Sequence, residues 1–292
     1  MKLGITGARG FVGKQLIQAA IRRGFEVIGY TRNPASPIHD CVETRRFSLN
    51  ETPDFEGCDA IIHLAGENVA GLWTAAKKRR IRDSRIDGAK QVLAGIRAAT
   101  RKPEVLIAAS AIGFYGDCGD ADITELSPPG TGYLAETCAE NEAMILDAEH
   151  LCRVVRARIG IVLGDGGALR VMRPIFKLGL GGPAGNGRQW MSWIHVTDLT
   201  ELLLFAALNL DVRGAMNATA PWPVRNADFT QLLAKSLGRP AFFRAPAFAL
   251  RLFLREFADE LLWSRRILPA VATAQKFGFR FPELTPAVFA NS

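Results

Sequence analysis

The chain lacks the features that typically build disulfide frameworks, metal sites and membrane spans. Its 292 residues include only five cysteines and four histidines, with no C-x-x-C pair, so neither a disulfide framework nor a metal site is expected. It has no run of about 18 apolar residues and no apolar leader segment after Met1. These absences predict a protein that is not exported, does not associate with membranes and resides in the reducing cytoplasm.

Charge of one sign is in excess but is not concentrated. Lysine and arginine number 36 against 29 acidic residues, for a formal net charge of +7. Domains that bind nucleic acid gather such charge into a patch or along one helix, whereas here it is scattered. The excess therefore favours an anionic nucleotide or a small acidic substrate as the ligand, and not nucleic acid.

The first 31 residues have the pattern of a βαβ unit. Residues 2–6 predict a short buried strand, residues 14–24 a helix that ends at its glycine, and residues 25–31 a second strand. Such a unit at the start of a chain of this length is typical of an α/β protein with a Rossmann-type, doubly wound parallel sheet.

A glycine-rich loop joins the first strand to the helix. Gly7, Gly10 and Gly13 have the spacing G-x-x-G-x-x-G, which allows a tight turn, close approach of a pyrophosphate and close packing of the helix. The N–H groups at the helix start are suited to binding phosphates. The predicted cofactor-binding residues of this loop are Gly7, Arg9, Gly10, Phe11, Val12 and Gly13.

The end of the second strand favours NADP over NAD. A site for NAD typically places a carboxylate there to bind the ribose hydroxyls, but this chain has Thr31, Arg32 and Asn33. The Arg32 guanidinium suits a 2′-phosphate, and Arg9 adds a second positive charge. The alternative is that Arg32 is only a solvated charge.

Two further apolar runs predict strands buried on both faces of the sheet. The run from residue 58 ends at Leu64, Ala65 and Gly66, which are predicted to lie against the cofactor. The run from residue 105 ends at Ser110, which is predicted to face the same crevice. Ligands of open α/β sheets bind beyond the carboxyl ends of the strands.

The predicted domain organisation follows from where this pattern changes. Residues 1–164 and 190–218 are assigned to an NADP-binding domain, and residues 165–189 and 219–292 to a flap and a smaller mixed α/β substrate-side domain. Arg173, Lys177 and Arg188 of the flap are predicted to bind an anionic substrate, unless this glycine-rich segment is only a loop. The apolar segment 245–257 predicts a core helix or a dimer face, which leaves monomer and homodimer open.

Several motifs resemble the extended short-chain dehydrogenase/reductase superfamily: TGARGFVG, HLAGE, SAIGFYGD and WIHVTDL. More narrowly, the chain is similar to an atypical epimerase-like group with a small C-terminal domain. The shared stretches are LAGE at 64–67, SR at 84–85, LGLGGPAGNGRQ at 178–189 and FGFRFPEL at 277–284. The resemblance implies that Arg85 contacts the cofactor, where many relatives have an asparagine, although a surface arginine is the alternative.

The same resemblance implies a catalytic serine, a tyrosine and a lysine four residues after it. Their positions in this chain are Ala111, Leu134 and Cys138, so all three groups are missing. Tyr133 lies one residue away, which rotates it by about 100° on a helix. Because no lysine or arginine follows it before Arg153, its phenol is expected to keep a pKa near about 10 and to act in packing or substrate contact.

Other side chains remain weak candidates for acid/base work: Tyr115, Tyr133, Ser110 and Glu67. Glu67 follows a strand end but is also consistent with a solvated loop carboxylate. Cys138 and His195 are interpreted as structural, since neither has an evident partner in the sequence.

Two classes of function therefore remain open. One is an NADP-dependent oxidoreductase or epimerase without the usual Ser-Tyr-Lys set, acting on a small anionic molecule. The other is a non-catalytic NADP(H)-binding module with a regulatory or redox-sensing role. The resemblance covers nearly the whole chain, yet it does not choose between them.

Overall fold

A seven-stranded parallel sheet forms the centre of the protein in the computed structural model, which describes residues 1–290. The strand order is β11-β7-β5-β4-β1-β2-β3, and every neighbouring pair is parallel. The strands are β1 (Lys2–Thr6), β2 (Glu26–Thr31), β3 (Glu43–Arg46), β4 (Ala60–His63), β5 (Val105–Ala111), β7 (Arg153–Ile159) and β11 (Gly214–Ala218). This order reverses direction at β1 and confirms the predicted Rossmann-type sheet.

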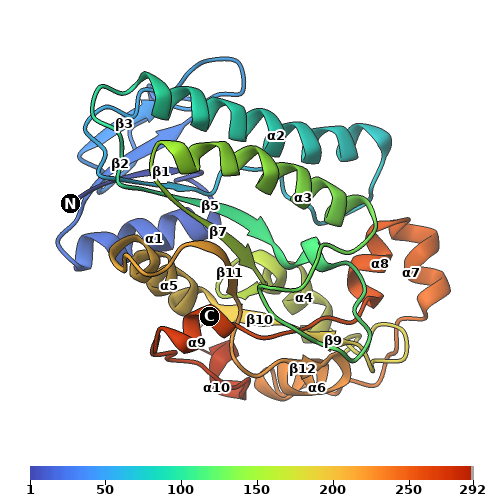
Figure 1. Ribbon diagram of the computed structural model, residues 1–292. Coiled ribbons are helices and arrows are strands. Elements are labelled where there is room, and N and C mark those ends of the chain that lie inside the picture. Colours follow the sequence, from blue (N-terminus) through green and yellow to red (C-terminus); the bar gives the residue numbers. More distant parts are fainter. Residues whose placement is uncertain (291–292) are drawn as a thin grey trace.

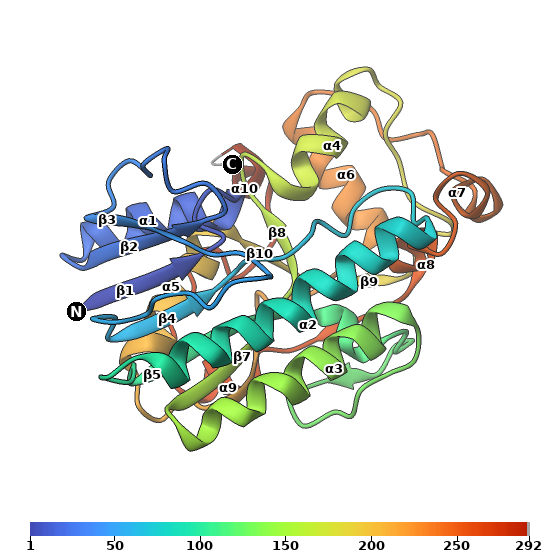
Figure 2. The ribbon, with the colours of Figure 1, turned by 90° about the horizontal axis from the view of Figure 1, so that it is seen from above.

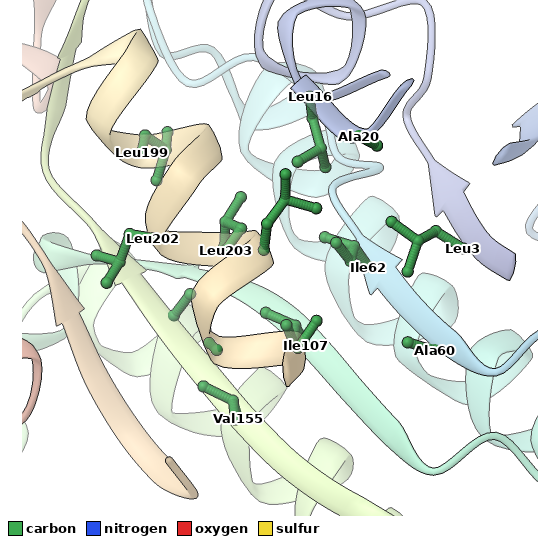
Figure 3. Packing of buried hydrophobic residues seen from close by; sticks show 14 of the residues in the cluster. Leu3, Leu16, Ala20, Ala60, Ile62, Ile107, Val155, Leu199, Leu202 and Leu203 are labelled. Carbon is green, nitrogen blue, oxygen red and sulfur yellow. The ribbon is translucent and has the colours of Figure 1, made fainter. Parts of the chain in front are cut away.

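Helices cover both faces of the sheet (Figure 1). One face carries α1 (Phe11–Arg22) and α5 (Val196–Leu208), and the other carries α2 (Ala75–Ala98) and α3 (Tyr133–Leu146). Figure 3 shows helix leucines directed at apolar strand residues: Leu16, Leu199, Leu202 and Leu203 against Leu3, Ile62, Ile107 and Val155. Burial of each such side chain stabilises the folded protein by roughly 1.5–3 kcal/mol. Because the strands are buried on both faces, their sequences are nearly continuous apolar runs.

The chain leaves the central sheet at Gly160. The apolar run VVRARIGIVLG, residues 154–164, predicts a single buried strand, and this is wrong: β7 ends at Ile159, and β8 (Ile161–Leu163) pairs instead with β10 (Trp193–His195). The amide of Gly160 still donates to the Ala218 carbonyl of the sheet, whereas the next amide donates to the Ser192 carbonyl. Because both strands are apolar, the sequence gives no sign that the strand is interrupted at Gly160.

A second apolar cluster lies beyond the carboxyl end of β1, around α4 (Gly167–Lys177) and α6 (Asn226–Ser236) (Figure 2). Its buried side chains include Leu169, Phe176, Trp193, Phe229, Leu233 and Val288. The remaining elements are β6 (Asp122–Ile123), β9 (Trp190–Met191), β12 (Val224–Arg225), β13 (Arg266–Ile267), α7 (Ala247–Leu254), α8 (Phe257–Leu262), α9 (Ala270–Ala274), α10 (Pro286–Ala290) and two 3-10 turns, Ile112–Tyr115 and Asp147–His150. Helix α4 and the carboxyl ends of the sheet strands bound the crevice in which ligands of such folds bind.

Helix α7 has no buried residue, and half of its side chains are exposed. Phe248, Leu252 and Phe253 are each 72–75% exposed, so the interpretation of this segment as a core helix is wrong, and the dimer face stays a prediction. Within residues 1–290, none of the helices combines the length and the apolar character that a bilayer span requires.

Candidate cofactor-binding site

The loop between β1 and α1 is shaped for close approach by a ligand. Gly7 has a φ of 68°, and a Cβ on it would lie 2.8 Å from the Leu64 carbonyl carbon. A Cβ on Gly13 would lie 2.3 Å from the Gly7 oxygen. Gly10 caps α1 without any side-chain hydrogen bond to the first-turn amides. The helix therefore begins with amides directed into the crevice, where an anion is stabilised.

A pocket of about 670 Å³ separates this loop from the start of α4. Its basic side chains are Arg9, Lys14, Arg170, Arg173 and Lys177, and its acidic residue is Asp165. The structure thus brings the predicted cofactor residue Arg9 together with Arg173 and Lys177, which the sequence assigned to the substrate. Arg188 does not line this pocket; it is exposed, and its backbone oxygen accepts a hydrogen bond from Arg225.

Arg9 is held at the carboxyl end of β2. Its Nε donates to Thr31 Oγ1 at 3.2 Å, and its guanidinium also donates to the Ser36 carbonyl. Arg32 is exposed beside them, and residues 27–39 include no acidic side chain. Two guanidinium groups without a competing carboxylate form a suitable environment for a phosphate monoester.

A buried hydroxyl joins the carboxyl ends of β1 and β4. Thr6 Oγ1 accepts hydrogen bonds from the amides of Leu64 and Ala65, both at 3.2 Å, and lies 2.7 Å from His63 Nδ1. With its lone pairs used by two amides, the hydroxyl donates its proton to Nδ1, so the imidazole carries its own proton on Nε2. These hydrogen bonds hold Leu64 and Ala65, two of the three residues predicted to contact the cofactor, and Gly66 is the next residue in the chain.

The stability of the protein is expected to depend on pH through His63. Burial, assisted by the charge of Arg85, lowers the pKa of His63 to about 4. The folded protein therefore binds this proton less readily than the unfolded chain, whose histidine titrates near about 6.5. The stabilising contribution is complete above about pH 6.5 and is lost as the pH falls toward 4.

Urea unfolding at pH 7 and at about pH 4.5 measures this effect. The wild type is expected to lose about 2–3 kcal/mol more than His63→Gln over that interval, because glutamine does not titrate. Equal losses in the two proteins would show that His63 is protonated without cost to the fold.

Arg85 and Ser84 of α2 hold the loop after β4. The Glu67 amide donates to Ser84 Oγ at 2.9 Å, and Arg85 donates to the carbonyls of Glu67 and Ile81 at 3.2 and 3.0 Å. Burial lowers the pKa of Arg85, and no carboxylate in residues 1–290 forms an ion pair with it. This guanidinium faces Gly66, since a Cβ on that glycine would lie 3.9 Å from Arg85 Nη1, and it remains suited to bind an oxygen of a ligand.

Glu67 is an ion-paired carboxylate. Lys77 Nζ lies 2.8 Å from its Oε1, and Arg80 Nε lies 3.5 Å from the same atom. The hydrogen bond from Lys77 is the main cause of a lowered pKa at Glu67. A carboxylate stabilised in its ionised form is a weak general base, which argues against acid/base work by this residue.

Ser110 and Tyr115 belong to a buried polar network. Ser110 Oγ donates to Glu142 Oε1 at 2.7 Å, and Glu142 accepts two further bonds of 2.9 Å from Arg158. Tyr115 accepts from Arg158 and donates to Asn217, both at 2.7 Å. Burial raises the pKa of Tyr115 to about 12, so its phenol stays protonated and holds the network in place.

The sequence interpretation missed Arg158. Its signal was an arginine inside an apolar strand, where a buried charge requires a partner. Its guanidinium also lies over the Phe114 ring at 3.6 Å.

Tyr133 is the first residue of α3, and its hydroxyl donates to the Lys78 carbonyl of α2. The expectation that no cation lies near it is wrong: Lys78 Nζ is 4.6 Å from the ring centroid, because a neighbouring helix supplies it. The pKa of Tyr133 is nonetheless raised, chiefly by burial. Leu134 and Cys138 are buried next to it, and burial also raises the pKa of the Cys138 thiol.

His195 has a structural position at the start of α5. The stretch WIHVTDL predicts a strand followed by a helix with Thr197 or Asp198 as its N-cap, and this cap is wrong: the Thr197 amide donates to His195 Nδ1 at 3.2 Å, so His195 caps the helix. The Asp198 carboxylate instead accepts the amides of Arg280 and Phe281. The His195 ring packs on Phe281 with a centroid distance of 4.2 Å.

Comparison with protein families places this geometry in a known group. Residues 3–218 match the model of the NAD dependent epimerase/dehydratase family, and residues 245–289 match a domain of unknown function, DUF1731. An epimerase family protein SDR39U1 homolog of Arabidopsis thaliana, described as chloroplastic, is 37% identical, with 99% of this chain and 86% of the relative covered. The epimerase family protein ML0860 of Mycobacterium leprae is also 37% identical, over 95% of this chain and 90% of its own.

Solved structures agree with this match. Human epimerase family protein SDR39U1, crystallised with NADPH, superposes with a TM-score of 0.91 at 30% identity, covering 100% of this chain and 99% of its own. A nucleoside-diphosphate sugar epimerase from Corynebacterium glutamicum gives a TM-score of 0.79 at 32% identity, with 100% of this chain and 57% of that one covered. MoeE5 in complex with UDP-glucuronic acid and NAD, at 19% identity and a TM-score of 0.79, shows the fold alone.

Proposed function

Because the chain belongs to the NAD dependent epimerase/dehydratase family, we propose that it binds NADPH between the glycine loop and α4 and reduces a small anionic molecule. The observation that carries this proposal is the pair Arg9 and Arg32 at the end of β2, in a segment without a carboxylate. NADPH differs from NADH by a 2′-phosphate at that position. The human relative crystallised with NADPH supports the same choice.

The residues present fit this cofactor. A side chain at Gly7 or Gly13 would collide with backbone atoms, so the loop keeps the shape that a pyrophosphate requires at the start of α1. Arg85 is a half-buried cation, and its side-chain hydrogen bonds within residues 1–290 go to the backbone carbonyls of Glu67 and Ile81. We assign it to the cofactor, where it binds ribose or phosphate oxygens.

The bound cofactor would supply a hydride from its nicotinamide ring, and the protein supplies binding, orientation and charge. Leu64, Ala65 and Gly66 present small or apolar surface at the end of β4, fixed by the Thr6 hydrogen bonds. Arg173 and Lys177 line the opposite wall on α4. In this proposal they attract the anionic group of the substrate as it enters.

A second function is favoured because the candidate catalytic hydroxyl groups are all hydrogen-bonded within the protein. Ser110, Tyr115 and Tyr133 each donate to an acceptor within the protein, and both tyrosines have raised pKa values. A proton donor for catalysis needs to reach the substrate, which none of these hydroxyls does without breaking its bond. The alternative proposal is therefore a non-catalytic NADPH-binding module that senses the cofactor.

The domain assignment remains a proposal in the same sense. The apolar cluster around α4 and α6 joins residues of 165–189 and 219–292 on the substrate side, and it also takes in Leu163 and Trp193 of the other group. The clusters on the two faces of the central sheet consist of residues from 1–164 and 190–218 on the cofactor side, except that Ala272 of α9 also packs into one of them.

Fluorescence titration of the purified protein with NADPH and with NADH tests the cofactor. NADPH is expected to bind at least about 10-fold more tightly, since one charge-assisted hydrogen bond contributes roughly 1.5–3 kcal/mol. Equal affinities would remove the assignment of Arg9 and Arg32. A screen of small carboxylates and phosphates for NADPH oxidation then separates the two functions: turnover supports the reductase, and tight binding without turnover supports the sensor.

A further inference from the structure

A second pocket, of about 410 Å³, lies where the N-terminal turns of α2 and α3 meet the junction of α7 and α8. Its polar lining consists of Lys78, Arg79, Arg82, Tyr133, Arg255 and Glu256. None of these residues lines the pocket between the glycine loop and α4. The two pockets therefore have separate walls, and a ligand of this one makes its own contacts.

The charge of this pocket is strongly unbalanced, with four cations against one carboxylate. Lys78 forms an ion pair of 2.7 Å with Glu256, and Arg82 pairs with Glu140. Arg79 and Arg255 are exposed, and no ion pair to either is present within residues 1–290. Two guanidinium groups are thus left to bind an anion from solution.

The backbone of Arg255 is strained. This residue ends α7 with φ 53° and ψ −137°, a combination that glycine adopts readily and that costs other residues about 1–3 kcal/mol. The strain places a guanidinium at the pocket between α7 and α8. Residues held in this way are concentrated at binding sites, because surrounding structure must compensate for the cost.

Another part of the pocket wall is fixed by aromatic packing. The Tyr133 ring lies 5.2 Å from Trp73 in an edge-to-face arrangement, and its hydroxyl donates to the Lys78 carbonyl. The Lys78 ammonium lies 4.6 Å above the same ring. This wall is therefore ordered before a ligand arrives, which reduces the entropy lost on binding.

We propose that this pocket binds a small dianion, either a phosphate ester or a dicarboxylate, between Arg79 and Arg255. A guanidinium presents a planar fork of donors that matches both groups. The proposal does not depend on the nature of the bound nucleotide, since the glycine loop contributes nothing to this site. It gives Tyr133 a role in a binding wall and not in proton transfer.

Isothermal titration calorimetry of the full chain with inorganic phosphate and with succinate, at constant ionic strength, tests the proposal. Saturable binding is expected in the Arg9→Gln variant, which removes a cation from the phosphate site at the end of β2, and adding Arg79→Gln or Arg255→Gln to it should weaken the binding by about 10-fold or more. Arg97→Gln is the matched control, since Arg97 lies near the far end of α2 and is exposed. Arg9→Gln removes a cation from the other pocket and should leave this binding unchanged.

The comparison of the two anions identifies the source of the charge: tighter phosphate binding indicates a phosphate ester, and tighter succinate binding a dicarboxylate. Arg255→Gly separates loss of binding from misfolding. Glycine relieves the backbone strain, so this variant should have a higher melting temperature and still bind the anion more weakly. Absence of saturable binding with both anions overturns the proposal. The proposal is also overturned if Arg9→Gln or Arg97→Gln lowers the affinity as much as Arg79→Gln and Arg255→Gln do.

Discussion

Arg158→Met is expected to lower the free energy of unfolding by about 3–5 kcal/mol, because it leaves the Glu142 carboxylate buried without its charged partner. The two side chains are 5% and 4% exposed and share two hydrogen bonds of 2.9 Å. Methionine fills a similar volume, so the loss reflects charge and hydrogen bonding more than a cavity. Chemical denaturation of wild type and variant measures it.

Two further variants separate the pair from its surroundings. Arg156→Met removes a guanidinium that is 3.4 Å from the same carboxylate and 18% exposed, so it should cost much less. The double variant Arg158→Met, Glu142→Leu removes both charges and should recover a large part of the loss. A single-variant loss below about 1 kcal/mol would mean that water reaches Glu142 and that the pair is screened.

The second large effect is expected at the cofactor. Arg9→Ala combined with Arg32→Ala should weaken NADPH by about 100-fold or more and leave NADH within about 3-fold, since each guanidinium contributes roughly 1.5–3 kcal/mol to a phosphate contact. Fluorescence titration of both nucleotides gives the two dissociation constants. The discrimination, and not the absolute affinity, is the quantity that depends on this pair.

The control for this experiment lies in the same pocket. Lys14→Ala removes a cation from the first helical turn, where it is suited to phosphates that both nucleotides share. It should weaken NADPH and NADH alike. If the double arginine variant also weakens both nucleotides equally, Arg9 and Arg32 act on the shared pyrophosphate and the preference for NADPH has another origin.

The parts of the site that are local in sequence were predictable. The loop Gly7–Gly13 follows from the chemistry of one turn between one strand and one helix, and the arginine at position 32 follows from the strand that precedes it. The parallel, doubly wound character of the sheet was also predictable, because parallel strands with helical crossovers have few allowed arrangements.

The contacts that join distant segments were not predictable. Lys78 reaches Tyr133 from another helix, and Arg158 binds Glu142 and Tyr115 across the end of the sheet. Their sequence spacing has no period that identifies a partner. Strand β3 was also missed, because a short, charged edge strand has no apolar alternation to signal it.

Phe11 connects the start of α1 with the segment that leads into α4. It is the first residue of α1, and its ring lies where a side chain on Gly164, Gly166 or Gly167 would be, at 2.6, 2.5 and 3.2 Å. The glycines that lead into α4 thus pack on the residue that follows Gly10 of the glycine loop. Because Phe11 also lines the pocket, the thickness of one aromatic ring sets the spacing between the glycine loop and the start of α4.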